Sequence, residues 1–142
     1  MTDLVAAAEG IRQLHQRYVD AVFRKDPEAF GNCFAKDSEW RVGGRVMRGR
    51  EEAVTMIKGV FPQFRRIMMT FRQPILEVGD GIASGRTYVT EHSTFADGTA
   101  FAPIGIYFEH FVDQGDAWRF KWRLFQTHYV GPPDMSGTWF DV

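Results

Sequence analysis

The sequence predicts an α+β fold, a cone-shaped barrel in which three N-terminal helices pack inside a strongly curved, mostly antiparallel sheet. Helical periodicity dominates residues 3–61, and long strand-like runs separated by short turns fill most of the rest. Helices that are segregated along the chain from an antiparallel sheet are typical of this class. The length of 142 residues fits one domain, 1–142, which ends in an extended tail at 131–142.

The first two helices are indicated by apolar spacing and by a capping signal. Over residues 3–25, apolar side chains recur every three or four positions, and Tyr18 lies on this stripe. Asp26 and Pro27 then provide an N-cap and a first helical residue. We expect this second helix to continue to near Asp37.

A hairpin and a third helix complete the N-terminal half. Gly43-Gly44 divides the residues 40–47 into two short strands joined by a tight turn. The next helix begins at Gly49-Arg50 and ends at Pro62, whose ring cannot continue a helix.

The C-terminal half predicts a meander of long strands. Pro74 marks an edge or a bulge, and Gly85, Pro103 and Gly105 are the points where strands this long are expected to bend. Neighbours in sequence should pair as antiparallel neighbours. The predicted strands are 66–78, 82–95, 99–112 and 117–130.

Composition excludes several functions. The formal net charge is -1 with Lys and Arg spread along the chain, so no nucleic-acid partner is expected. No apolar run is long enough to span a bilayer, and no secretory signal opens the chain. The single Cys33 fits a reducing, cytoplasmic location and an inert core thiol. The aromatic fraction of 15% favours a cavity with aromatic walls or an apolar subunit interface.

A possible pocket wall lies on the strand 82–95. Side chains two residues apart share a face, so Tyr88, Thr90 and His92 should point the same way. This mixture suits neither a packed nor a solvated face. His92 is the candidate general acid or base, because an imidazole titrates near neutral pH. The alternative is a structural histidine.

Several phrases in this order resemble the SnoaL-like branch of the nuclear transport factor 2-like superfamily over about residues 11–130. They are Arg17-Tyr18-Val19-Asp20, Phe34-Ala35-Lys36-Asp37 leading to Trp40, Gly49-Arg50-Glu51, Gly105-Ile106-Tyr107 and Trp118-Arg119-Phe120. The resemblance implies a curved sheet that wraps around the first helix and leaves a pocket. Such proteins include ketosteroid isomerases, scytalone dehydratase, polyketide cyclases, small dioxygenase subunits and binding proteins, so the fold does not decide the function.

The resemblance assigns residues only in part. Tyr18 falls where ketosteroid isomerases carry the tyrosine that donates to the enolate oxygen, and Tyr107 falls on their acidic oxyanion donor. Their general-base aspartate falls near Val42, which argues against the steroid isomerase mechanism. His92 lies on the strand that carries a scytalone dehydratase histidine, but the tyrosine and aspartate of that enzyme fall on Val22 and Phe23. The resemblance therefore favours His92, Tyr18 and Tyr107 as catalytic residues.

Two orientations of the last strands are possible. The residues Ile104, Ile106, Phe108, Val112, Trp118, Phe120, Trp122 and Leu124 form the more apolar face. Hydrophobicity alone makes that face the core, with His110 inward, whereas the resemblance makes it an outer face buried by a second subunit. We follow the resemblance and expect a homodimer. Glu109 and Arg123 then form a cross-strand pair that faces either the pocket or solvent.

The expected function is cofactor-free and metal-free binding of a hydrophobic, cyclic, oxygenated small molecule, with acid-base catalysis of the lyase or isomerase type if the protein is an enzyme. Alternatives are a non-catalytic binding module and a small structural subunit of a ring-hydroxylating dioxygenase. His15 and His128 are expected at the surface or rim. The expected substrate-binding residues are Trp40, Tyr88, Thr90, Glu109, Arg123 and Phe125.

Overall fold

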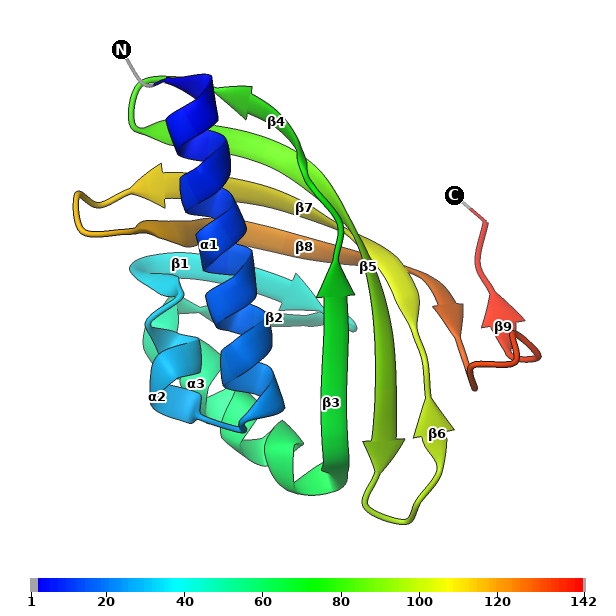
Figure 1. Cartoon of the computed structure of the whole chain (residues 1–142). Helices are drawn as coiled ribbons and strands as arrows, with labels where there is room; N and C mark the ends of the chain where they lie inside the picture. The colour runs from blue at the N-terminus through cyan, green and yellow to red at the C-terminus, as the bar shows by residue number, and fades with distance from the viewer. Residues whose placement is uncertain (1–2, 142) are drawn as a thin grey trace.

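The computed structural model describes residues 3–141 and confirms the α+β class. In this part of the chain, three α-helices and a short 3₁₀ helix pack against a strongly curled sheet (Figure 1). The helices are α1 (Leu4–Phe23), α2 (Pro27–Gly31), α3 (Gly49–Val60) and the 3₁₀ helix η1 (Phe61–Gln63). The strands are β1 (Phe34–Val42), β2 (Arg45–Arg48), β3 (Phe64–Phe71), β4 (Ile75–Val78), β5 (Ile82–Phe95), β6 (Ala100–Phe101), β7 (Ile104–Asp113), β8 (Trp118–Val130) and β9 (Thr138–Trp139).

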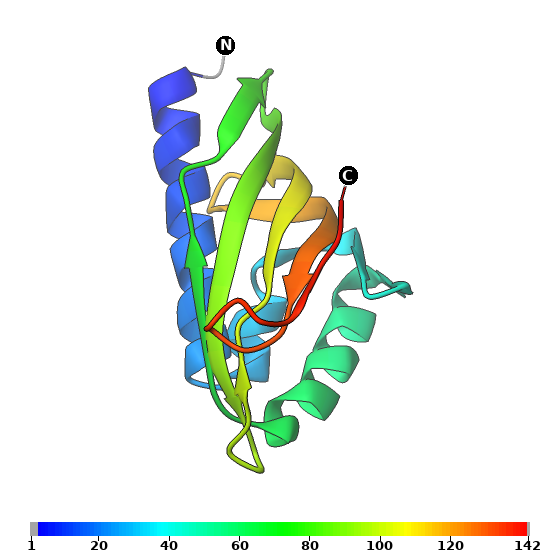
Figure 2. The same ribbon diagram turned by 90° about the vertical axis from the view of Figure 1, so that its right-hand side faces the viewer.

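The strands form one mixed sheet in the order β2-β1-β8-β7-β5-β3. As predicted, strands that follow one another in the second half pair antiparallel, and β4 and β6 also pair with β5. The pairing of β1 with β8 is parallel and joins the N-terminal half to the end of the meander. Figure 2 shows the sheet curling between α1 on one side and α3 on the other.

The helix α1 supplies one wall of the core. Asp3 caps it by accepting a hydrogen bond from the backbone N–H of Val5. The helix crosses β3 and β8, and Gly10 permits this close approach because a Cβ at that position would collide with the indole of Trp118. Its buried face consists of Ala7, Ile11, Leu14, His15, Tyr18, Ala21 and Val22.

The second helix is shorter than predicted. It ends at Gly31, and the expected continuation to Asp37 is wrong. The chain instead enters β1 at Phe34, which pairs with Phe120 of β8 and is fully buried. Tertiary pairing therefore outweighs the local helical preference of this segment.

Proline divides two of the predicted strands. The run predicted at 66–78 is interrupted before Pro74, so that β3 and β4 pair separately with β5. Pro103 likewise separates β6 from β7. The predicted hairpin at 40–47 is confirmed, with Gly43 and Gly44 both at positive φ.

The inward face of β5 is the opposite of the predicted one. Thr87, Val89 and Ser93 are buried, whereas Tyr88 and His92 are exposed on the outer face. The predicted inward orientation of Tyr88, Thr90 and His92 is therefore wrong. Because side chains alternate strictly between the two faces of a strand, an error about one of these residues applies to all three.

The choice between the two faces of β7 is resolved in favour of the resemblance. Tyr107 and Glu109 are buried and His110 is exposed, so the alternative with His110 in the core is wrong. The outer face of β8 is apolar only in part, because the register with β7 shifts at His110. Beyond this shift Trp118 and Phe120 turn into the core, contrary to prediction.

Candidate active site

A buried ion pair lies at the centre of the sheet. Glu109 on β7 and Arg123 on β8 are register partners, and Arg123 Nε donates to Glu109 Oε2 at 2.8 Å. Their side chains are fully shielded from solvent. The sequence left open whether this pair faces inward or outward, and the structure shows that it faces inward. A buried charge requires such a partner because desolvation is costly.

The second oxygen of Glu109 joins a helix to the sheet. His15 Nε2 of α1 lies 2.9 Å from Oε1, and Thr87 Oγ1 of β5 donates to the same oxygen at 3.0 Å. Burial by itself would raise the pKa of Glu109, but the charges of His15 and Arg123 and these hydrogen bonds lower it to about 2. The carboxylate is therefore ionised at neutral pH and can only accept, so His15 Nε2 carries the proton of this hydrogen bond.

Aromatic rings enclose the guanidinium of Arg123. Its Cζ lies 3.7 Å from the ring centroid of Tyr107, 3.9 Å from that of Phe120 and 4.4 Å from that of Tyr18. Among the described residues, Nη1 and Nη2 find no hydrogen-bond partner. Burial opposes the charge, yet Tyr107 and Glu109 raise the pKa of Arg123 above its ordinary value. Burial also raises the pKa of Tyr18 well above its ordinary value.

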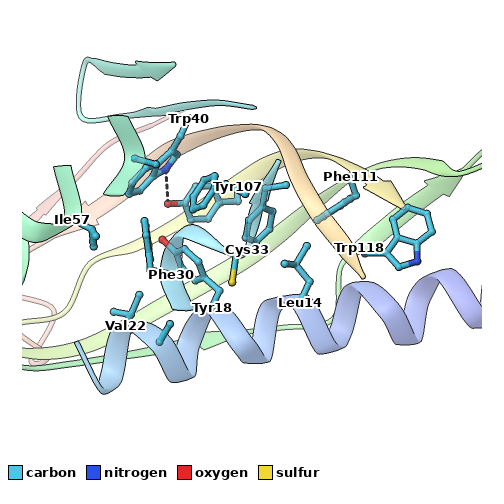
Figure 3. Close-up of a cluster of buried hydrophobic side chains, with 14 of the residues drawn as sticks. Leu14, Tyr18, Val22, Phe30, Cys33, Trp40, Ile57, Tyr107, Phe111 and Trp118 are labelled. Atoms are coloured by element: carbon cyan, nitrogen blue, oxygen red, sulfur yellow. Dashed lines mark hydrogen bonds between the residues drawn. The ribbon is translucent and has the colours of Figure 1, made fainter. Parts of the chain in front are cut away.

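Tyr107 connects this cluster to the rest of the core. Trp40 Nε1 donates to the hydroxyl of Tyr107 at 3.2 Å, the dashed line in Figure 3. The ring of Phe125, which is half-buried, lies 4.8 Å from that of Tyr107. Figure 3 also shows Tyr18 pointing from α1 toward the same group of side chains. The structure thus brings together six of the expected site residues: Tyr18, Trp40, Tyr107, Glu109, Arg123 and Phe125.

A cavity of about 380 Å³ opens beside this cluster, between α1 and the crossing from β3 to β4. His15 and Phe71 both line it, and their ring centroids are 4.9 Å apart. The volume lies at the small end of the range for ligand pockets. Most of the remaining lining is apolar or long and flexible: Leu4, Val5, Ala8, Glu9, Arg12, Gln16, Arg72, Gln73, Pro74 and Leu76.

The other expected site residues lie elsewhere. His92 and Tyr88 are exposed on the outer face of β5, and Thr90 shares that side of the strand. His92 therefore does not converge with Tyr18 and Tyr107, the arrangement that the sequence suggested.

His15 is the site residue that sequence reasoning missed. The expectation of a surface or rim position is wrong, because only 2% of the residue is exposed. Its position four residues after Ile11 and three before Tyr18 puts it on the buried stripe, so the helical spacing contained the signal. His128 is half-buried and contacts the side chain of Gln126.

Glu91 is a second inward-facing carboxyl group that the sequence did not single out. It lies on β5 between the buried Val89 and Ser93 and opposite Met69 of β3. Burial raises the pKa of Glu91 to about 7, although Ser93 lowers it. Among the described residues, no cation forms an ion pair with Glu91. A carboxyl group with this pKa can donate or accept a proton near neutral pH.

The described part of the chain offers no metal site, since no three His, Cys, Asp or Glu side chains gather there. Within residues 3–141 we also find no helix of the length and apolarity needed to cross a membrane. Cys33 is buried, and burial raises the pKa of its thiol to about 11, as expected of an inert core cysteine.

The model of the SnoaL-like domain family matches residues 3–123. The chain therefore belongs to the SnoaL-like domain family, as its sequence indicated. A search of curated proteins finds no match.

Solved structures resemble the whole chain. A hexachlorocyclohexane dehydrochlorinase, LinA-type3 from Novosphingobium barchaimii, shares 18% identity at a TM-score of 0.80, over 97% of this chain and 96% of that one. A Novosphingobium aromaticivorans protein suggested to be a scytalone dehydratase shares 19% identity at a TM-score of 0.84, over 97% of this chain and 90% of that one. Another protein from that organism, suggested to be an aromatic ring hydroxylase, shares 20% identity at a TM-score of 0.85, over 96% of each chain. At these identities the likeness shows the fold alone.

Proposed function

We propose that the protein performs acid-base chemistry on a hydrophobic, cyclic, oxygenated small molecule, and that His15 moves the proton. The observation that carries this proposal is the position of His15, which lines the cavity beside α1 while its Nε2 lies 2.9 Å from Glu109 Oε1. A base that is oriented by a carboxylate and reaches a pocket is the arrangement of general acid-base catalysts. The neighbouring SnoaL-like folds named as dehydrochlorinase and suggested dehydratase support this class of reaction.

The hydrogen bonds around His15 and Glu109 support a distinct role for each residue. Because Nε2 donates to the ionised Glu109, Nδ1 is the ring nitrogen of His15 that is left to exchange a proton with a ligand. A proton taken at Nδ1 produces an imidazolium whose charge is stabilised by Glu109. Arg123 and Thr87 hold the carboxylate in place and act through it as positioning residues. Elimination of water, or isomerisation next to a carbonyl, needs a proton transfer of this kind.

The first test follows proton abstraction alone and does not depend on the formation of a particular product. We expect the protein to accelerate exchange of the α-protons of cyclohexanone or cyclohexenone for deuterium in D₂O, followed by NMR. His15→Gln should slow the accelerated exchange by about 10²-fold or more, the usual contribution of a positioned general base. His92→Gln is the matched control and should leave the rate unchanged, since His92 is exposed on the outer face.

Three outcomes separate the alternatives. Exchange that survives His15→Gln and is lost in Glu91→Gln would move the proton transfer to the other inward acid. Loss of exchange in His92→Gln would restore the outer-face histidine as the base. Binding of the ring ketones without exchange in the wild type would contradict catalysis and favour the non-catalytic module.

We further propose that the protein is a homodimer formed through the outer sheet face. This face carries the exposed Tyr88 and Leu124 and a hollow of about 660 Å³ bordered by Ile106, Phe108 and Trp139. Trp139 is 55% exposed although its ring contacts Tyr129. A two-fold interface needs one patch that offers both protruding and recessed apolar groups, and this face has both.

The dimer predicts twice the chain mass of 16.3 kDa in light scattering at micromolar concentration. Leu124→Lys should convert the dimer to a monomer, because it would bury a charge in the interface. Val46→Lys, at an exposed apolar position of β2, is the control and should leave the mass unchanged. A wild-type protein that is strictly monomeric would contradict this assembly.

We also assign the protein to the cytoplasm. The buried Cys33 thiol, which has no cysteine partner in this sequence, suits a reducing compartment.

A further inference from the structure

The charges around the His15 cavity are unequal. The lining residues include two guanidinium groups, those of Arg12 and Arg72, and one carboxylate, that of Glu9. The rest of the lining consists of apolar side chains, glutamines and His15. Behind His15, the charges of Glu109 and Arg123 compensate each other. The pocket lining therefore has one positive charge in excess.

The two arginines differ in how they are engaged. Arg12 is held by Glu9, with Nε–Oε2 and Nη2–Oε1 distances of 2.8 and 2.6 Å. Arg72 has no ion-pair partner within residues 3–141. Its main chain is nevertheless fixed, because its N–H donates to the carbonyl of Tyr88 at 3.0 Å. The excess charge is thus an unpaired guanidinium on an anchored stretch of backbone.

Arg72 is close in sequence to the reacting group that we have proposed. It directly follows Phe71, whose ring lines the cavity 4.9 Å from the ring of His15. Because Phe71, Arg72, Leu76 and His15 all line this cavity, we expect a ligand bound in it to contact both the imidazole and the guanidinium.

Building on the proposed function of this cavity, we propose that its ligand is a small apolar molecule carrying one carboxylate, and that Arg72 binds this carboxylate. A guanidinium recognises a carboxylate through two parallel N–H donors, which fixes orientation as well as charge. Leu4, Val5 and Ala8 of α1 provide apolar contact for the ring or chain. Arg72 then determines which molecules enter, whereas His15 determines what happens to them.

The test compares two probes of nearly equal size, cyclohexanecarboxylate and cyclohexylmethanol, titrated into the protein at low ionic strength and followed by NMR. We expect the wild type to prefer the carboxylate by about fivefold, the upper range for a solvent-accessible ion pair. Arg72→Gln should remove this preference and leave the affinity for the alcohol unchanged. Arg66→Gln, at an exposed arginine of β3 outside the cavity lining, is the matched control and should retain the preference.

The outcomes distinguish this inference from the proposed function. Equal binding of both probes by the wild type, with the resonances of His15 shifted, would retain the cavity as a ligand site and refute the role of Arg72. A preference that persists in Arg72→Gln would refute it in the same way. Failure of both probes to shift the resonances of residues that line the cavity would count against the cavity as a ligand site, and hence against both proposals. Addition of salt should weaken the carboxylate selectively, because the ion pair is exposed.

Discussion

Arg123→Met is expected to lower the free energy of unfolding by about 3–5 kcal/mol, as measured by urea denaturation at pH 7. The substitution removes the cation from the fully buried pair. It leaves Glu109 ionised in the core with His15 and Thr87 as its remaining hydrogen-bond partners among the described residues. The guanidinium of Arg123 also packs between the rings of Tyr107 and Phe120, whose centroids both lie within 4 Å of its Cζ. The loss of this packing adds to the cost.

The double variant Glu109→Gln/Arg123→Met is the informative companion. It removes both charges and should be more stable than Arg123→Met alone, because no isolated ion remains in the core. Arg12→Gln breaks an exposed ion pair and should change the free energy of unfolding little, because water screens such pairs. An Arg123→Met variant as stable as Arg12→Gln would contradict the view that the buried pair holds the sheet and α1 together.

The same ion pair makes the stability of the protein depend on pH in the acidic range. The folded pKa of Glu109, about 2, lies below the ordinary value of 4.5. The stability that its ionised form contributes is therefore complete above pH 4.5 and is lost as the pH falls from 4.5 through about 2. Glu109→Gln should lack this part of the acid dependence.

The sequence identified the fold because its signals were redundant. Helical spacing, the capping pair Asp26-Pro27 and the glycine turn of the hairpin each agreed with the resemblance, and the structure confirms all of them. The predicted end of the second helix was wrong because the pairing of Phe34 with Phe120 spans more than eighty positions, and local periodicity carries no information about it.

The site was predicted only where one strand face was chemically distinct. On β7, Tyr107 and Glu109 alternate with apolar residues, so the inward face followed once the resemblance had fixed the orientation. On β5 both faces carry hydroxyl groups and at least one titratable residue. His92 accompanies Tyr88 and Thr90, whereas Glu91 accompanies Thr87 and Ser93. A two-residue period cannot choose between such faces, and only the helix packed on the sheet decides.

Glu91→Gln is expected to stabilise the protein at neutral and alkaline pH, by about 3 kcal/mol at pH 8. Burial raises the pKa of Glu91 from 4.5 to about 7, so the folded state retains a proton that the unfolded chain has already lost. The stability associated with this proton is complete below pH 4.5 and is lost as the pH rises from 4.5 through about 7. Glutamine has nearly the same shape and cannot ionise, so the variant avoids the loss.

The measurement is the free energy of unfolding from urea titrations between pH 4.5 and 8 for both proteins. The difference between Glu91→Gln and wild type should be near zero at the acidic end, increase through the interval and level off above pH 7. Glu77→Gln, at an exposed carboxylate of β4, is the control and should give a curve parallel to that of the wild type. If the curve for Glu91→Gln were also parallel to that of the wild type, water or a counter-charge would already stabilise the ionised carboxylate. Glu91 could then not exchange a proton near pH 7 as a second inward-facing acid.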